Sequence, residues 1–371
     1  MKLSKYLLGD LIQQRREKNS FDGLPICGVT RDGFIPPKQQ DADTSLYNVF
    51  YKGDFVFNPA RMELNSIVFN DTYDKAICSS LYEVFYVKRT DIVVPEFLAL
   101  LVKQNWFTRY CEFLGSGSAR EYCRVANISE IEIELPPIEN QIEIAHQHKT
   151  LVERIALKKH INDNLEVQLS GFYHHFFDNP ENGVSGLIAD LGEVVGGATP
   201  STNNPAYFCD DGIAWISPKD LTGTGLKFIF RGEQCITESA YNSCSTKLMP
   251  AGTVLFTSRA PVGTVAIAMN DICTNQGFKS VIPKKEIGTA FVYYFLKENK
   301  QLIESHASGT TFMEVSGNVL KNIPAIVPKP EVAAQFTAIC TPLFNEQRQN
   351  ELEIGRLQEL QQTLVSSISS R

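Results

Sequence analysis

The sequence predicts a mixed α/β (α+β) protein made of two similar domains, each followed by a long helix. In residues 138–177, side chains suited to a helix seam alternate four and three positions apart, and the same alternation returns in the last forty residues. Each position of the second stretch lies 192 residues after its counterpart, as Leu343 does after Leu151 and Ile368 after Phe176. A 4-3 alternation gives a helix one face that meets a partner helix. The shared register therefore predicts that the two helices are partners of each other.

The composition is that of an ordinary globular chain without overall basic character. The 371 residues leave room for two or more domains, with 43% hydrophobic and 21% charged residues. The net charge of −7 and the pI near 5.5 lower the expectation of nucleic-acid binding, although local basic patches can still contact phosphates. Nine cysteines include no Cys-x-x-Cys pair, which favours reduced, mostly buried thiols.

No stretch of the sequence resembles a targeting or membrane segment. The N-terminus becomes polar after one short apolar patch, so no signal peptide is expected. The most apolar window, Phe97 to Val102, is far shorter than the roughly 20 residues that a membrane span needs. We therefore expect a cytoplasmic protein.

Residues 1–137 are predicted to form the first domain. It opens with a short amphipathic segment from Leu7 to Gln14, and β-rich runs separated by Gly, Pro, Asn and Asp follow. A helix is expected from Pro95 to about Phe113, then a Gly/Ser loop from Gly115, and a closing strand from Ile128 to Leu135. The predicted strands are Asn48 to Tyr51, Phe55 to Asn58, Ser66 to Phe69 and Leu81 to Val87.

Residues 179–327 are predicted to form a second domain that repeats this order after a short polar linker. Gly252-Thr-Val-Leu-Phe matches Gly53-Asp-Phe-Val-Phe, and a predicted helix from Ala290 to His306 precedes a Ser-Gly-Thr-Thr loop at Ser308. A duplication at about 190 residues is far longer than the repeats of solenoid proteins. The pattern therefore indicates two copies of one domain.

The long helices are predicted at residues 138–178 and 328–371, as an antiparallel intramolecular coiled coil that relates the domains by a pseudo-two-fold axis. Forty helical residues at about 1.5 Å each span roughly 60 Å. The alternative is that each helix packs separately on its own domain. Polar seam residues would favour one register of the pair, namely Lys158, Asn162, Gln347 and Asn350.

No motif in the sequence makes a persuasive active site. Asn203-Asn-Pro-Ala-Tyr-Phe is similar to the Asn-Pro-Pro-Tyr/Phe motif of amino-methyltransferases, but Ala206 replaces the second proline and an Asn/Pro turn explains the segment well. The sequence contains no glycine-rich nucleotide-binding motif, and its histidine pairs lack the glutamate and spacing of a zinc protease site. We therefore expect no catalytic residue, no directly bound cofactor and no metal site.

Two groups of loops carry the residue types that contact nucleic acids. In the first domain, Asn58-Pro-Ala-Arg follows a strand and Gly117-Ser-Ala-Arg-Glu-Tyr-Cys-Arg follows a helix. In the second domain, Thr257-Ser-Arg-Ala-Pro-Val-Gly occupies the corresponding place, and Thr274-Asn-Gln-Gly-Phe-Lys-Ser comes after it. Arg can pair bidentately with guanine, and Asn or Gln with adenine. The alternative for each arginine is a solvated surface group.

Taken together, these features resemble the DNA-specificity subunit of type I restriction-modification systems over essentially the whole chain. The resemblance depends on the duplicated architecture, on the loops just quoted and on the entries into the two helices. Those entries are Leu135-Pro-Pro-Ile-Glu-Asn-Gln-Ile and Val327-Pro-Lys-Pro-Glu-Val-Ala-Ala-Gln-Phe. The family pattern is Leu-Pro-Pro-x-x-Glu-Gln; Asn140 stands where Glu is usual, and the second entry is two residues longer.

The resemblance implies two target recognition domains, each of which reads one half of a split DNA site from the major groove. The helices would act as a ruler for the non-specific spacer between the halves. The chain itself would be non-catalytic and would dock two methyltransferase subunits, which bind S-adenosylmethionine and methylate one adenine per half-site. Restriction (translocase-endonuclease) subunits would join where they are present.

The resemblance also implies which side chains contact DNA. The first domain would use Arg61, Arg120 and Arg124, and the second would use Lys219, Arg259, Gln276 and Lys279. Further candidates are Arg31, Asn58, Thr310 and Thr311.

Two other functions stay open at this point. One is a stand-alone DNA methyltransferase with the degenerate Asn-Pro-Ala-Tyr motif, and the other is a coiled-coil adaptor that does not bind DNA.

Overall fold

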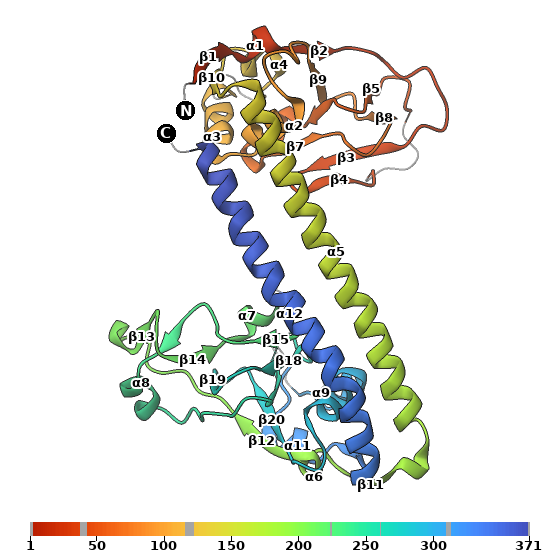
Figure 1. The fold of residues 1–371 in the computed structure, drawn as a ribbon, viewed down its shortest axis with the longest axis vertical. Coiled ribbons are helices and arrows are strands. Elements are labelled where there is room, and N and C mark those ends of the chain that lie inside the picture. The colour runs from red at the N-terminus through yellow and green to blue at the C-terminus, as the bar shows by residue number, and fades with distance from the viewer. Residues whose placement is uncertain are drawn as a thin grey trace. The chain divides into compact units, whose positions relative to one another are not determined.

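The computed structural model describes residues 3–37, 43–115, 122–222, 225–259, 261–308 and 313–369 (Figure 1). The chain divides into two compact units, of which the first comprises Met1–Ile155 and Leu357–Arg371 and the second Ala156–Arg356. Two long helices, α5 (Ile138–Phe177) and α12 (Pro330–Ser369), each contribute a segment to both units. The two long helices that the seam patterns predict are therefore present.

The first unit consists of mixed sheets covered by short helices. Its elements are β1 (Ser4–Leu7), α1 (Leu8–Leu11), β2 (Ile12–Arg15), β3 (Ile26–Thr30), β4 (Gly33–Ile35), β5 (Asn48–Tyr51), β6 (Phe55–Phe57), η1 (Pro59–Leu64), β7 (Ile67–Phe69), β8 (Lys75–Cys78), β9 (Glu83–Val87), α2 (Pro95–Val102), α3 (Asn105–Gly115), α4 (Val125–Ile128) and β10 (Glu132–Leu135). One antiparallel sheet has the order β2–β9–β6–β7, and a second has the order β4–β3–β8–β5 with a parallel β3/β8 pair. The antiparallel pair of β1 with β10 closes the domain directly before α5.

The second unit repeats this plan. Its elements are η2 (Pro180–Asn182), β11 (Gly183–Leu187), α6 (Ile188–Leu191), β12 (Gly192–Gly196), η3 (Pro205–Tyr207), β13 (Phe208–Cys209), β14 (Ile213–Ile216), α7 (Pro218–Thr222), β15 (Phe228–Ile229), β16 (Cys235–Ile236), α8 (Glu238–Ser243), β17 (Val254–Phe256), β18 (Val265–Ala268), β19 (Ile272–Thr274), β20 (Lys279–Pro283), α9 (Thr289–Glu298), α10 (Lys300–Ser305), α11 (Gly317–Lys321) and β21 (Pro324–Pro328). The sheets have the orders β12–β20–β17–β18–β15 and β13–β16–β14–β19, and β11 pairs with β21 as β1 does with β10. The predicted duplication is confirmed by this repeated order.

The central strand of each unit is apolar on both faces because a core lies on either side of it. Side chains alternate across a strand. In β6, Phe55 therefore faces the helical core of the first unit, whereas Val56 belongs to the core on the opposite face. In β17 of the second unit, Val254 likewise belongs to the core on one face and Leu255 to the core on the other.

The turn before each central strand has the same backbone in both units. Gly53 has φ +89° and Gly252 has φ +86°, in the left-handed region that residues with a Cβ rarely adopt. The N–H of Gly53 donates to the carbonyl of Asn70, and that of Gly252 to the carbonyl of Ala268, both at 2.8 Å. The sequence match of these two segments is therefore also a match of backbone geometry.

The predictions of single helices at residues 95–113 and 290–306 were wrong, since each is broken in two. The carbonyl of Val102, where α2 ends, accepts a hydrogen bond from Asn65 Nδ2 at 3.0 Å. At the break between α9 and α10, Asn299 Nδ2 donates to the carbonyl of Phe295 at 2.9 Å. At the first break, a side-chain amide thus satisfies a carbonyl that a continuous helix would use internally; at the second, the carbonyl of Phe295 accepts from both the N–H and the side-chain amide of Asn299. Likewise, the predicted strand from Ile128 begins only at Glu132, because Val125–Ile128 forms α4.

Within the second unit, α5 and α12 pair through the polar seam residues that the sequence identifies. Lys158 Nζ donates to Asn350 Oδ1 at 2.8 Å, and Asn350 Nδ2 donates to Asn162 Oδ1 at 2.9 Å. Asn162 Nδ2 donates to the carbonyl of Gln347 at 3.1 Å, and Gln347 Nε2 donates to the carbonyl of Asn162 at 3.2 Å. These bonds satisfy each other only in one register, so the polar seam fixes the alignment of the helices.

In the first unit the same two helices pair again. His148 Nε2 of α5 lies 3.1 Å from Gln361 Nε2 of α12. In the second unit, residue numbers rise from Lys158 to Asn162 along α5 while they fall from Asn350 to Gln347 along α12, so the pairing is antiparallel. None of the helices in the described residues combines the length and apolar content needed to cross a membrane.

A fully buried amide joins α5 to the first domain. Gln141 Oε1 accepts from the N–H of Val94 at 3.0 Å. Its Nε2 donates to the carbonyls of Ile92 and Pro136, at 2.9 and 2.8 Å. All of these partners are backbone groups, which explains why the helix entry carries Gln at this position.

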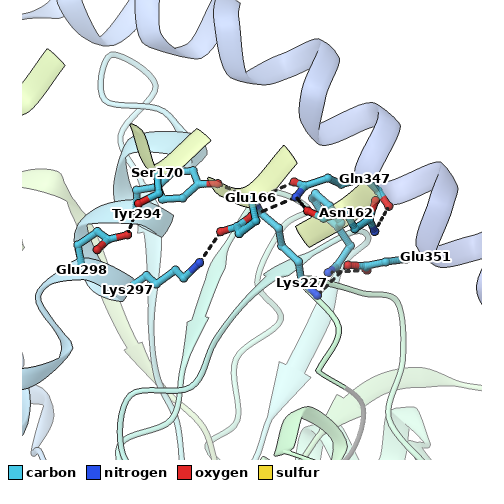
Figure 2. A network of polar contacts seen from close by, with 10 residues as sticks. Asn162, Glu166, Ser170, Lys227, Tyr294, Lys297, Glu298, Gln347 and Glu351 are labelled. Atoms are coloured by element: carbon cyan, nitrogen blue, oxygen red, sulfur yellow. Dashed lines mark hydrogen bonds and ion pairs between the residues drawn. The ribbon is translucent and has the colours of Figure 1, made fainter. Parts of the chain in front are cut away.

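A buried ion network joins both helices to the sheet of the second unit (Figure 2). Lys227, whose side chain is 7% exposed, donates to Glu166 Oε2 of α5 at 2.8 Å. It also donates to Tyr294 of α9 and to Gln347 of α12, both at 2.9 Å. Lys297 pairs with the other oxygen of Glu166. Because a buried charge is costly unless it is paired, the sheet and both helices depend on this carboxylate.

The charges around Glu166 change its titration. Burial by itself would raise the pKa of Glu166, but the charges and hydrogen bonds of Lys227 and Lys297 outweigh burial and lower the pKa to about 2. The folded state therefore favours the ionised carboxylate more strongly than the unfolded state does.

Replacing Glu166 by Gln should destabilise the second unit by roughly 2–4 kcal/mol at neutral pH, because Lys227 would then be buried beside a neutral amide. The folded-state pKa lies below the unperturbed value of 4.5, so this contribution is present above pH 4.5 and is lost as the pH falls toward 2. Urea unfolding of wild type and variant should therefore show a stability difference that narrows on acidification.

The matched control is Glu153→Gln on the same helix, where an exposed carboxylate lies 3.8 Å from Lys149. This exposed pair should contribute less than about 1 kcal/mol. An equal loss of stability in both variants would contradict the role assigned to Glu166.

Candidate nucleic-acid interface

In the second unit, two buried hydroxyl residues shape the loop that follows β17. Thr257 and Ser258 are both fully buried. Thr257 Oγ1 donates to the carbonyl of Pro261 at 2.7 Å and accepts from the N–H of Thr264 at 2.8 Å. These bonds close the loop on itself, so the backbone that carries Arg259 is fixed from inside.

Ser258 connects this loop to two others. Its N–H donates to the carbonyl of Gly277 at 2.7 Å, and its carbonyl accepts from the N–H of Val315 at 2.9 Å. The loops at residues 257–259, 274–279 and 313–316 are therefore held together by backbone bonds, although they are distant in the sequence.

The loop between β19 and β20 turns tightly beside α7. Asn275 Oδ1 accepts from the N–H of Gly277 at 2.8 Å, and the N–H of Asn275 donates to the carbonyl of Ile216 at 2.9 Å. A Cβ on Gly277 would lie only 2.8 Å from Pro218 Cγ, so the close approach requires glycine. Phe278, which follows Gly277, is fully buried, whereas Gln276 is exposed at the turn.

The structure brings Arg259, Gln276 and Lys279 together, as the sequence predicts for one binding surface. Arg259 Nε lies 3.0 Å from Glu314 Oε2, and Lys279 Nζ lies 3.6 Å from Glu314 Oε1. Lys279 Nζ also donates to the carbonyl of Gln276 at 3.3 Å, and the hydroxyl of Thr199 donates to Gln276 Oε1. We call Arg259, Gln276, Lys279 and Glu314 the loop cluster.

Lys219 lies on α7, directly after the Pro218 that contacts the Gly277 turn. Its Nζ lies 2.9 Å from Glu233 Oε2, and this hydrogen bond raises the pKa of Lys219. Both side chains are highly exposed, so the pair is open to exchange with another anion. Two further predicted residues, Thr310 and Thr311, lie outside the described residues.

In the first unit, the corresponding loop follows β6. The side-chain oxygen of Asn58 accepts from the N–H of Ala60 at 3.1 Å and so caps η1. Arg61 is exposed and interrupts η1 with φ −141°. The loop ends at Asn65, which is buried and has φ +53°. Asn58 thus has a structural role in the loop, and Arg61 is an exposed basic residue of the loop.

A second segment of the first unit lies beside this loop, as residues 313–316 lie beside the loop of the second unit. The N–H of Cys123 donates to the carbonyl of Pro59 at 3.0 Å. Arg124, which follows, places Nη1 3.2 Å from Glu83 Oε1 and its guanidinium carbon 5.6 Å from the ring of Tyr122. The segments that carry Asn58 and Arg61 and the segment that carries Arg124 are therefore joined by a backbone bond, whereas Arg120 lies outside the described residues.

Arg31 occupies the exposed turn between β3 and β4. Its carbonyl accepts a hydrogen bond from Lys103 Nζ at 2.6 Å. Burial lowers the pKa of Lys103 to about 8, and the charge of Arg31 adds to this effect while that of Asp32 opposes it. Lys103 is a basic residue that sequence reasoning missed, because it was placed inside one continuous helix.

The carboxylates Glu83 and Glu314 were also missed. Glu314 follows the second Gly/Thr loop, and an isolated β-bridge brings its backbone beside that of Arg259. Glu83, on β9, additionally accepts from the N–H of Val125 at 2.6 Å. No local sequence signal marks either pairing, since the partners are 55 and 41 residues apart.

The Asn203–Phe208 segment folds as the Asn/Pro turn that was the alternative to a methyltransferase motif. Asn204 Oδ1 accepts from the N–H of Ala206 at 3.3 Å and caps η3. Across the described residues, no three potential metal-ligating side chains are grouped closely enough to hold an ion.

Comparisons with known proteins point to one family. The family described as type I restriction modification DNA specificity domain matches residues 35–167 and 180–362. The MjaIX specificity subunit of Methanocaldococcus jannaschii, a type I restriction enzyme subunit, is 41% identical over 171 residues, covering 44% of this chain and 39% of that protein. The HindI specificity subunit of Haemophilus influenzae is 21% identical, with 97% of both chains covered.

The fold agrees with this assignment. The crystal structure of a type I restriction-modification S subunit from M. genitalium has a TM-score of 0.65 and 14% identity, and the comparison covers 99% of this chain and 96% of that one. Since the two family matches together span well over half of the residues, the chain belongs to the DNA-specificity subunits of type I restriction-modification systems, which are non-catalytic.

Proposed function

We propose that this specificity subunit reads a bipartite DNA site, with residues 1–137 recognising one half and residues 179–327 the other. The observation that carries the proposal is the loop cluster, in which an arginine, an amide and a lysine converge on loops fixed by buried hydroxyls. Arg259 suits guanine, Gln276 suits adenine, and Lys279 and Lys219 suit phosphates. Arg61 and Arg124 occupy the corresponding loops of the other domain, and Arg31 lies at the turn between β3 and β4.

The rest of the proposal concerns partners. The paired segments of α5 and α12 would bind two methyltransferase subunits and, where present, restriction subunits, and the helix length would set the spacer between the half-sites. S-adenosylmethionine would be bound by the methyltransferase subunits and by no site in this chain. The protein would act in the cytoplasm, where bacterial and archaeal chromosomes lie.

The test begins with methylome sequencing of the host with and without this gene, which gives both half-sites and the spacer. The purified complex with its methyltransferase subunits is then titrated with duplexes in which one half-site at a time is scrambled. Dependence of affinity on both halves is expected. If scrambling one of the half-sites does not change the affinity, bipartite reading is refuted. Methyl transfer by the chain alone would support the stand-alone enzyme instead.

Arg259→Ala should lower the affinity for the matched duplex by roughly 1–3 kcal/mol, because a bidentate contact to a base edge is lost. Discrimination should relax only at the half-site read by residues 179–327. Fluorescence anisotropy with single-base-pair variants of each half-site measures both effects. The control is Lys247→Ala, an exposed lysine of the same unit that lies 3.4 Å from Glu193.

Arg61→Ala should have the reciprocal effect and relax only the half-site read by residues 1–137. Its matched control is Arg89→Ala, an exposed arginine of the same unit that pairs with Asp91 at 2.7 Å. If Arg61→Ala and Arg259→Ala relaxed the same half-site, the assignment of one half to each domain would be wrong.

A further inference from the structure

In the second unit, the basic side chains of the proposed DNA surface are paired with carboxylates of the same unit. Arg259 and Lys279 share Glu314, and Lys219 pairs with Glu233. A phosphate backbone attracts every exposed cation in the same way, whatever the DNA sequence. A carboxylate placed among such cations therefore changes the balance between phosphate binding and base reading.

Glu314 is held more firmly than a typical surface carboxylate. Its N–H and carbonyl exchange hydrogen bonds of 3.0 Å with Ser308, and it forms a β-bridge with Arg259. The side chain is 33% exposed, and that of Lys279 only 16%. The backbone that carries this carboxylate is therefore held on both sides.

The contact between Glu314 and Arg259 uses one particular edge of the guanidinium. Glu314 Oε2 lies 3.0 Å from Nε, and within the described residues no hydrogen bond from the Nη1/Nη2 edge is found. That remaining edge is the one that can donate two parallel hydrogen bonds to guanine O6 and N7. The carboxylate thus leaves the base-reading edge available and restricts the orientation of the group.

The charge of Glu314 has a second effect. It offsets part of the positive charge of Arg259 and Lys279 and repels a phosphate that approaches either of them. A neutral base edge is not repelled in this way. The carboxylate therefore weakens contacts to phosphates, which carry no sequence information, more than it weakens contacts to base edges.

We propose that Glu314 is a specificity-determining residue, which positions Arg259 for base reading and suppresses phosphate binding at the loop cluster. This inference rests on the proposed reading of DNA by residues 179–327. Glu314 acts through Arg259 and needs no contact with a base, so it is a positioning residue.

The experiment compares wild type, Glu314→Gln and Glu314→Asp in the complex with its methyltransferase subunits. The probes are the matched bipartite duplex, the same duplex with the half-site read by residues 179–327 scrambled, and a random-sequence duplex of equal length. For Glu314→Gln, affinity for the scrambled and random duplexes should rise about three- to tenfold, while affinity for the matched duplex changes less. The slope of log affinity against log salt on random DNA should steepen by about 1.

Two variants separate the charge from other effects. Glu314→Asp keeps the charge and should keep the wild-type discrimination. Glu193→Gln removes an equally charged side chain of the same unit that pairs with Lys247, and should also leave discrimination unchanged. Thermal unfolding of each complex verifies that the variants are folded.

The proposal is overturned if wild type discriminates between the duplexes and Glu314→Gln discriminates equally well. It is also overturned if Glu314→Gln weakens binding to all duplexes by the same factor, which would indicate a purely structural role. If the affinity of the wild-type complex does not depend on the half-site read by residues 179–327, the proposed function fails and Glu314 has no specificity to determine.

Discussion

The burial of one ammonium group organises the second unit. Lys227 Nζ has acceptors on α5, α9 and α12, and it lies 4.0 Å from the centre of the Phe344 ring. An uncompensated charge in such surroundings would be very costly, so all three helices must present their groups at once. In the first unit, the entry of α5 is joined to its domain by the neutral amide of Gln141, which needs no counterion. The long helices are therefore tied to their domains by an ion network at one place and by a hydrogen-bonded amide at another.

Much of the fold could be predicted because the relevant signals are periodic or repeated. The 4-3 seam identified both long helices and the polar residues that bond across them, and the recurrence of Gly53 at Gly252 identified equivalent turns. The helix breaks could not be predicted. At Val102, the apolar pattern continues while the carbonyl bonds to Asn65, a residue 37 positions earlier. Local pattern carries no information about such a contact.

The candidate site divides in the same way. The loops were found from their residue types, because Thr257, Ser258 and Gly277 sit beside Arg259 and Gln276 in the chain. The carboxylates that pair with the cations were not found, since only the folded sheet brings Glu314 to Arg259 and Glu83 to Arg124. A positive residue in a loop is therefore visible in a sequence, whereas the charge it faces becomes visible only in three dimensions.

The buried hydroxyls of Thr257 and Ser258 have a consequence for how such a protein changes over time. The groups that hold the loops are hidden, and replacing one would leave buried polar atoms unsatisfied at a cost of about 1–3 kcal/mol. Substitutions at exposed positions such as Gln276 usually cost less than about 0.5 kcal/mol. If the loops read DNA as proposed, stability and recognition are carried by different side chains of the same short loops. New recognition specificities could then arise by single substitutions at the exposed positions, without a folding defect that further mutations must first repair.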